Sequence, residues 1–265
     1  NLSDAEKTVY AKWQINEFDV EFVVLTKSQG NYQETPAVYG GKFVKDLQNE
    51  ELSSDIYKLT GKFNYKHEIN ISDIFKVTDG FNFAGISLSD SNSEALKDIE
   101  TIVVESKYNY VFFKFDPKTA VITLNANGGV FEYNQEWTFN HDFSVASKEV
   151  EYLTQTPSLP NISRRGYSLV CWLNEDAEYT LPSTIDFYQD KTLTASWNAL
   201  TFKLTVSAGI ANEILGDKGS FNAADIDSSI WQVQTDSNGN IVAIVANVNY
   251  DQNVQFAIKP FANGY

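Results

Sequence analysis

Hydrophobic and polar residues alternate with a period of two along much of the chain. Val20, Phe22 and Val24, for example, fall on one face of residues 19–25. This period is typical of a half-buried strand. It predicts further strands at residues 63–77, 110–115, 121–124, 191–197, 201–209 and 241–245. Residues 45–59 depart from the pattern because their leucines and isoleucine follow mixed helical spacings, and we expect a short amphipathic helix there.

Strands predicted at residues 121–124 and 191–197 open and close one complete module. The opening strand ends in the turn Asn-Ala-Asn-Gly-Gly, and the closing strand has the sequence Asp-Lys-Thr-Leu-Thr-Ala-Ser-Trp. Between them, a proline-containing connector leads to Gly-Tyr-Ser-Leu-Val-Cys-Trp at residues 166–172. Glycine can supply the tight-turn backbone before a strand, and large tryptophan rings can anchor a small core.

Parts of this module recur in the rest of the chain. Residues 80–86 align with residues 166–172, residue against residue. Residues 110–115 and 6–13 both match the closing strand, with Phe115 in the place of the final tryptophan. We therefore expect four parts: the closing strand of a preceding repeat (1–18), a repeat (19–118) with an insertion near 44–77, the best-preserved repeat (119–198) with an insertion near 131–154, and a degenerate repeat or distinct β-rich module (199–265).

Taken together, the opening strand with its turn, the glycine-first segment and the closing strand resemble the Listeria–Bacteroides repeat, which is related to the internalin B-repeat of bacterial surface proteins. The resemblance implies a mainly β (α+β) fold, built from tandem small β-grasp-like modules in an elongated array. It also implies adhesion or spacing at the bacterial cell surface without catalysis. Two positions depart from the family pattern, because Cys171 replaces the usual small residue and Ile86 replaces the motif tryptophan. Both insertions are also larger than the family norm.

Composition narrows the possible partners. The chain carries 35 acidic and 20 basic residues, a formal net charge of −15, so nucleic-acid binding is not expected. No apolar run reaches the roughly 18 residues that span a bilayer, so we expect no membrane insertion in this segment, with any signal and anchor outside it. The resemblance implies neighbouring repeats of the same chain as partners, with a host or cell-surface glycan or protein as a further one, in an extracellular location.

Four aromatic or imidazole side chains in the insertion of the best-preserved repeat are candidate ligand-binding residues. They are Tyr133, Trp137, Phe139 and His141. Exposed rings near acids and amides suit a sugar-binding face, although the same rings would also suit an ordinary core, which aromatic residues usually favour. The alternative to a stalk or adhesin segment is therefore a carbohydrate- or receptor-binding module that uses the two insertions. An enzyme-associated accessory region is a further alternative.

The residues give no pattern for catalysis, a metal site or a cofactor. The two histidines, His67 and His141, have no second ligand at metal-binding spacing. No Gly-x-Ser-x-Gly, phosphate-loop or His-Glu-x-x-His segment occurs. The single cysteine, Cys171, cannot form an internal disulfide and is expected to be a packed, inert side chain rather than a thioester. A lysine–asparagine isopeptide crosslink stays open, since no spacing singles out a pair.

Overall fold

The protein is mainly β. The computed structural model describes residues 10–71, 74–88, 91–95, 99–105, 110–207, 219–221, 223–237, 239, 241–256 and 258–260. The one helix within these ranges is the short 3-10 helix Ala223–Asp225, so the mainly β prediction is confirmed. No helix in the described ranges is long and apolar enough to cross a bilayer.

Two compact units make up the chain. Unit 1 consists of Asn1–Ile122, Glu149–Pro157 and Leu181–Lys191, and unit 2 of Thr123–Lys148, Ser158–Thr180 and Thr192–Tyr265. The strands before residue 118 are β1 (Glu17–Ser28), β2 (Asn31–Gln33), β3 (Gly41–Lys45), β4 (Glu51–Ile56), β5 (Lys58–Asn64), β6 (Glu68–Asn70), β7 (Phe75–Val77), β8 (Phe81–Leu88), β9 (Thr101–Val103) and β10 (Tyr110–Pro117). The module boundaries predicted from the sequence stay predictions.

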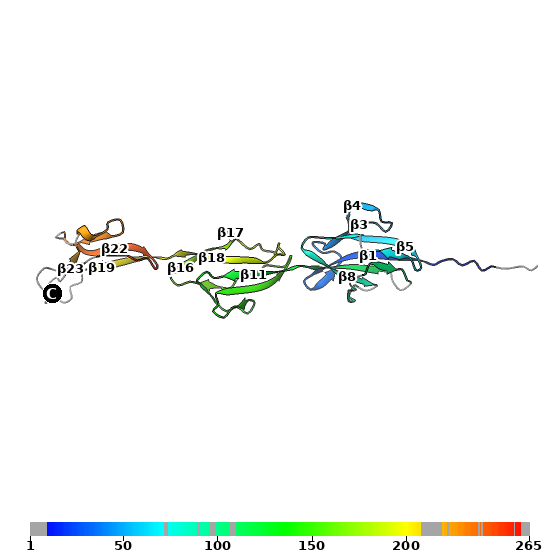
Figure 1. Ribbon diagram of the computed structural model, residues 1–265, viewed down its shortest axis with the longest axis horizontal. Helices are drawn as coiled ribbons and strands as arrows, with labels where there is room; N and C mark the ends of the chain where they lie inside the picture. Colours follow the sequence, from blue (N-terminus) through cyan, green and yellow to red (C-terminus); the bar gives the residue numbers. More distant parts are fainter. Residues whose placement is uncertain are drawn as a thin grey trace, which may run out of the picture. The chain divides into compact units, whose positions relative to one another are not determined.

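The main sheet of unit 1 has the strand order β2-β1-β10-β8, and β5 also pairs with β1 (Figure 1). β1 and β10 are parallel, with Phe22 opposite Val111 and Val24 opposite Phe113. Parallel neighbours need a long crossover connection. Here the crossover contains the small sheets β4-β3-β7 and β6-β9.

Aromatic rings fill the core of unit 1. Phe113 is fully buried at its centre, with the ring of Phe43 at 5.2 Å, that of Phe75 at 5.3 Å and that of Phe22 at 6.2 Å, measured between centroids. Edge-to-face and tilted contacts of this kind add to the free energy gained by burying the rings. The alternation seen in the sequence thus places one face of β1 and β10 on this core.

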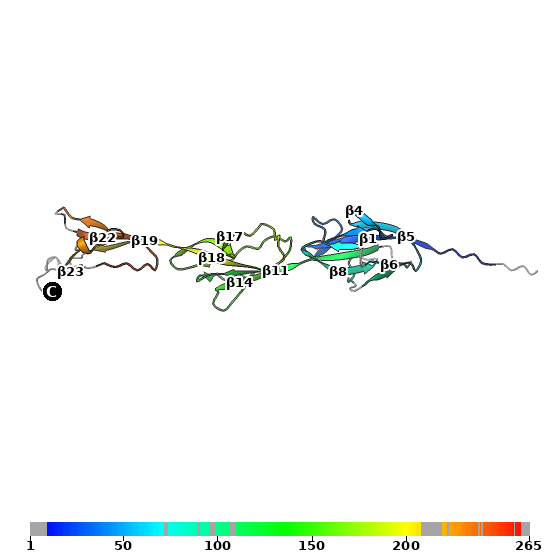
Figure 2. The ribbon, with the colours of Figure 1, turned by 45° about the horizontal axis from the view of Figure 1, so that its top comes forward.

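The later strands are β11 (Thr119–Asn125), β12 (Val130–Phe131), β13 (Thr138–Phe139), β14 (Val145–Glu151), β15 (Ile162–Ser163), β16 (Tyr167–Asn174), β17 (Ala177–Tyr179), β18 (Lys191–Ala199), β19 (Thr201–Ser207), β20 (Gly219–Phe221), β21 (Gln232–Thr235), β22 (Ile241–Asn249) and β23 (Ile258–Pro260). They form a six-stranded sheet in the order β13-β14-β11-β18-β16-β17 and a three-stranded sheet in the order β19-β22-β21. Figure 2 shows β19 and β22 side by side.

The two segments aligned in the sequence have the same local structure. β8 and β16 each begin directly after a glycine with positive φ, Gly80 at 85° and Gly166 at 79°. Each pairs antiparallel with its closing strand, β8 with β10 and β16 with β18. Each pairing skips the residue four places after its glycine, which forms a β-bulge. Residues 80–86 and 166–172 therefore occupy equivalent positions in their strand pairs.

A second repeated pairing joins each opening strand to the strand beside it. In β1 and β5, Glu17 lies opposite Asn64, and in β19 and β22, Thr201 lies opposite Asn249. A tyrosine follows directly after both partner strands. Residues 201–249 therefore repeat the pairing of residues 17–64, although the earlier sequence pattern degrades after residue 209.

The helix expected at residues 45–59 is wrong, because these residues form a β-hairpin with β3. Phe43 lies opposite Ile56, and Lys45 opposite Glu51. The Asp46 carboxylate accepts hydrogen bonds from the backbone N–H groups of Gln48 at 2.9 Å and Glu50 at 2.8 Å. Such side-chain acceptors favour a turn over a helix. Three of the apolar side chains that suggested a helix, Leu47, Leu52 and Ile56, pack against the core from this hairpin, and the fourth, Leu59, does so from β5.

Candidate functional site

The sequence-predicted ligand site lies around an aromatic cluster in unit 2. The cluster consists of Phe131 in β12, Phe139 in β13, and Tyr133 and Phe143 in the adjoining loops. Phe139 is central, with the ring of Phe143 at 5.3 Å, that of Phe131 at 6.0 Å and that of Tyr133 at 6.2 Å. Phe131 is buried and Tyr133 is exposed, so this row of rings runs from the core to the surface.

A hydrogen-bonded turn positions one side of this cluster. The Asn140 amide donates to Ser144 Oγ and accepts from the Val145 backbone N–H, both at 2.9 Å. Ser144 Oγ in turn donates to Asp142 Oδ1 at 2.7 Å, and this hydrogen bond lowers the pKa of Asp142. Phe143 adopts a left-handed backbone with φ 55° within the turn, which places its ring against Phe139. The turn thus positions the Phe143 ring against Phe139.

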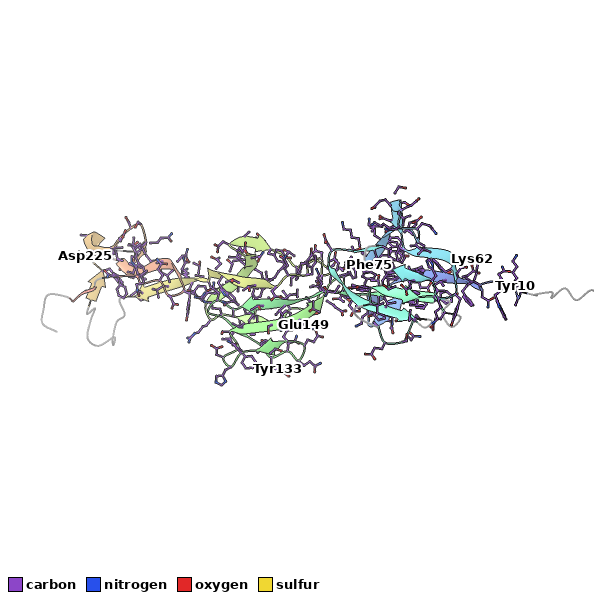
Figure 3. All side chains as sticks on the ribbon, turned by 45° about the vertical axis from the view of Figure 1, so that its right-hand side comes forward. Tyr10, Lys62, Phe75, Tyr133, Glu149 and Asp225 are labelled. Carbon is purple, nitrogen blue, oxygen red and sulfur yellow. The ribbon has the colours of Figure 1, made fainter. Side chains whose placement is uncertain are left out.

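The four predicted ligand-binding residues lie in different environments. Tyr133 is 75% exposed, and Figure 3 shows its side chain pointing away from the strands. Phe139 is half-buried beside it, and His141 is exposed in the neighbouring turn. Trp137 is only 4% exposed, and its indole N–H donates to the Ser158 carbonyl at 2.9 Å. The structure therefore brings Tyr133 and Phe139 together, whereas the face of Trp137 is not available to a ligand.

A second group of aromatic side chains lines a cavity of about 460 Å³ in unit 1. Tyr39 and Tyr57 stack with ring centroids 3.7 Å apart and planes 7° from parallel. Lys42 forms an ion pair with Asp55 at the same cavity, and this hydrogen bond raises the pKa of the lysine. Both charged groups are exposed, so solvent weakens their interaction.

One lysine of unit 1 is buried and held by polar contacts. Lys114 in β10 is 2% exposed, and its ammonium donates to the Ser93 carbonyl at 2.6 Å and lies 4.7 Å from the Tyr32 ring centroid. The Tyr32 hydroxyl donates to Asp116 at 2.6 Å. Burial, together with this carboxylate, raises the pKa of Tyr32. Carbonyl oxygen and ring together stabilise a buried cation that would otherwise be costly.

The most regular feature is a contact between each motif glycine and a tyrosine far along the chain. In unit 1, the Gly80 carbonyl accepts from the Lys118 N–H at 2.8 Å, and the Lys118 carbonyl accepts from the Tyr152 N–H at 2.9 Å. In unit 2, Gly166, Leu200 and Tyr250 make the same two bonds at 2.8 and 2.9 Å. We call this arrangement the glycine–tyrosine contact.

Ring packing completes both glycine–tyrosine contacts. Tyr152 packs edge-to-face on Phe81, with centroids 5.6 Å apart, and Tyr250 packs on Tyr167 at 5.7 Å. A Cβ added to Gly80 would overlap the Tyr152 ring, and a Cβ on Gly166 would overlap the Tyr250 ring. Glycine is therefore required at these positions both for its left-handed backbone and for the approach of the ring.

Sequence reasoning missed both tyrosines as functional residues. A usable signal existed, because a tyrosine follows directly after β5, β14 and β22, at Tyr65, Tyr152 and Tyr250. These positions could be matched only once each strand was known to lie beside an opening strand. The opening and closing strands themselves, which the sequence did identify, supply the other side of each contact.

The described residues contain no group of three histidine, cysteine or acidic side chains that could hold a metal ion. Cys171 is half-buried in β16. Comparison of the chain with protein-family models and with curated proteins gives no match.

Proposed function

We propose that this chain is a non-enzymatic, extracellular repeat segment of a bacterial surface protein that acts as a stalk or adhesin spacer in cell-surface attachment. Its parts are tandem, small, β-grasp-like modules, in keeping with the resemblance to the Listeria–Bacteroides repeat. The observation that carries the proposal is the glycine–tyrosine contact, which occurs twice with the same hydrogen bonds. In a tandem array each repeat contacts its neighbours, and a connection that recurs along one chain supports such an arrangement.

The strand order supports a β-grasp-like module. β5 and β8 flank a central parallel pair, β1 and β10, which are the first and last strands of the main sheet. The chain therefore enters this sheet at one end and leaves it at the other. A pull on the two ends would load the hydrogen bonds between β1 and β10 in shear, so many bonds would have to break together.

The connections between successive modules are short. One residue, Lys118, separates β10 from β11, and one residue, Leu200, separates β18 from β19. Both backbone groups of each linker residue are hydrogen-bonded in a glycine–tyrosine contact. Such a linker has little freedom to bend, which suits a spacer that keeps a distal domain away from the cell.

A surface-display experiment tests the spacer function. The full chain would be placed between a cell-surface anchor at its C-terminal end and an epitope tag at its N-terminal end, beside a globular domain of the same length as control. We expect a large antibody to reach the tag on this chain more readily than on the globular control. Equal labelling of the two would contradict the proposal.

A binding module is the second candidate function, and the exposed ring of Tyr133 beside Phe139 favours it. Planar rings that are open to solvent can stack on the apolar face of a sugar ring. Glycan-array binding of the full chain would be compared with that of Tyr133→Ala, with Tyr110→Ala as a control at another exposed tyrosine. No binding by the full chain, or equal binding by all three proteins, would remove this candidate.

A further inference from the structure

One of the three tyrosines that follow a partner strand has no glycine against it in the described residues. The Tyr65 N–H donates to the Asn16 carbonyl at 2.8 Å, which matches the bond from Tyr152 to Lys118 and from Tyr250 to Leu200. Tyr65 therefore stands at the position of a glycine–tyrosine contact, with its linker residue already in place.

Ring packing around Tyr65 also matches that around Tyr250. Phe18, two residues after the linker residue Asn16, packs edge-on to Tyr65 at 6.2 Å. Phe202, two residues after its own linker residue, packs on Tyr250 at 6.4 Å. The ring of Tyr65 is thus held on the same side as that of Tyr250, by a residue at the equivalent position.

Two properties of this surface differ from those of the filled contacts. Tyr65 is 46% exposed, whereas Tyr152 and Tyr250 are half-buried. The N–H of Asn16 has no acceptor within the part of the chain that the structure describes, whereas the equivalent N–H groups of the other linker residues donate to Gly80 and Gly166. What is missing at Tyr65 is therefore a carbonyl acceptor and a flat, side-chain-free surface, and a glycine supplies both.

The residues before Asn16 indicate where that glycine would come from. Trp13 precedes Asn16 by three residues, as Phe115 precedes Lys118 and Trp197 precedes its own linker residue. Trp197 is half-buried and its indole N–H donates to a backbone carbonyl at 2.8 Å, whereas Trp13 is 90% exposed.

The residues on either side of Trp13 are exposed too. Tyr10 is 85% exposed and Ile15 61%, and Figure 3 shows Tyr10 on a segment that no strand accompanies. Residues 10–15 thus carry the side chains of a closing strand without a sheet. Apolar side chains left in water in this way favour burial against a partner.

We propose that the surface formed by Asn16, Phe18 and Tyr65 is a docking site for another module of the same kind, which presents its motif glycine to Tyr65 and takes residues 10–15 as its closing strand. This inference rests on the tandem arrangement proposed above. The partner is therefore a β-module with a glycine-first strand, and its contact with this chain repeats the two already present at Gly80 and Gly166.

A fusion protein tests the docking site directly. Residues 119–189 would be joined in front of residue 6 of the chain, so that residues 6–15 take the place of residues 190–199 and a second copy of Gly166 faces Tyr65. Amide hydrogen exchange would then be compared with that of the unfused chain. We expect exchange of the Asn16 N–H to slow by at least about tenfold, because it gains a glycine carbonyl as acceptor.

Matched variants of the fusion separate the contact from general stabilisation. Tyr65→Ala should return exchange of the Asn16 N–H to the rate of the unfused chain, whereas Tyr110→Ala, at an exposed tyrosine of the same unit, should leave it slow. Equal effects of the two substitutions, or an unchanged Asn16 rate with the added module folded, would overturn the inference.

Whether the added module folds in the fusion also tests the inference. A second fusion, with residues 17–107 in front of residue 6, presents Gly80 in place of Gly166. If residues 10–15 complete neither added module, the inference is also wrong, since it requires them to act as a closing strand. The display experiment and substitutions at Gly80 do not involve Tyr65, so the tandem proposal would survive such a failure.

Discussion

Substituting Gly80 with alanine should destabilise unit 1 by more than the same change at another glycine of similar backbone. Gly80 and Gly30 both have positive φ, 85° and 82°, so alanine costs about 1–2 kcal/mol at either position for the left-handed backbone. The surroundings differ, because a Cβ on Gly30 would meet no atom within 4 Å, whereas a Cβ on Gly80 would overlap the Tyr152 ring. Overpacking of this kind adds about 1–3 kcal/mol.

We therefore expect Gly80→Ala to lower the free energy of unfolding by about 2–5 kcal/mol and Gly30→Ala by about 1–2 kcal/mol. Chemical denaturation of the full chain, followed by circular dichroism and calorimetry, would measure both. The two substitutions would also be made in a Tyr152→Ala background, where the excess cost at Gly80 should disappear. Equal costs at the two glycines, or an excess that persists without the tyrosine ring, would refute the glycine–tyrosine contact.

Three further predictions concern individual side chains. Trp137→Ala should lower the free energy of unfolding by about 3–5 kcal/mol, and Tyr133→Ala by no more than about 0.5 kcal/mol, in thermal melts; equal effects would show that the two burials are misassigned. Phe113→Ala should cost about 3–5 kcal/mol, and an unchanged melting temperature would contradict its place in the core. Because its pKa is raised, Tyr32 should stay protonated in a spectrophotometric alkaline titration at a pH above the ordinary range for tyrosine. The stability that this raised pKa contributes should be full below the ordinary tyrosine pKa and should be lost as pH rises from there through the raised pKa. Asp116→Ala, which removes both the acceptor and the charge, should bring the pKa of Tyr32 down, and no change would exclude the carboxylate as a cause.

Strands and the internal repeat could be predicted from the sequence because both signals are local. Alternation in residues 19–25 reports directly which side chains face the core, and the equivalence of residues 80–86 and 166–172 needs only residue types in order. The structure adds the shared bulge and pairing, which depend on strands distant in the chain.

Burial of single aromatic side chains could not be predicted in the same way. Trp137 and Tyr133 lie four residues apart in one segment, yet one is 4% exposed and the other 75%. The buried indole meets a partner distant in the chain, because its N–H donates to the Ser158 carbonyl. The hairpin at residues 45–59 was missed for a related reason, since the side-chain hydrogen bonds of Asp46 outweigh the spacing of the leucines.

Long-range contacts explain why the tyrosines escaped notice. Tyr152 lies 34 residues after Lys118, and Tyr250 lies 50 residues after Leu200. No sequence period links these positions, because the segments between them differ in length. Only the pairing of each partner strand with an opening strand brings the tyrosine N–H to the linker carbonyl.

Small-angle X-ray scattering of the full chain tests the central claim, that tandem β-modules form a spacer, most directly. A single compact globule of 265 residues has a radius of gyration of about 18 Å. Three modules placed end to end, each roughly as long as a strand of 8 to 12 residues, give a rod of roughly 100 Å. Such a rod has a radius of gyration of about 30 Å. A value near 30 Å is the predicted result, and a value near 18 Å would contradict the array.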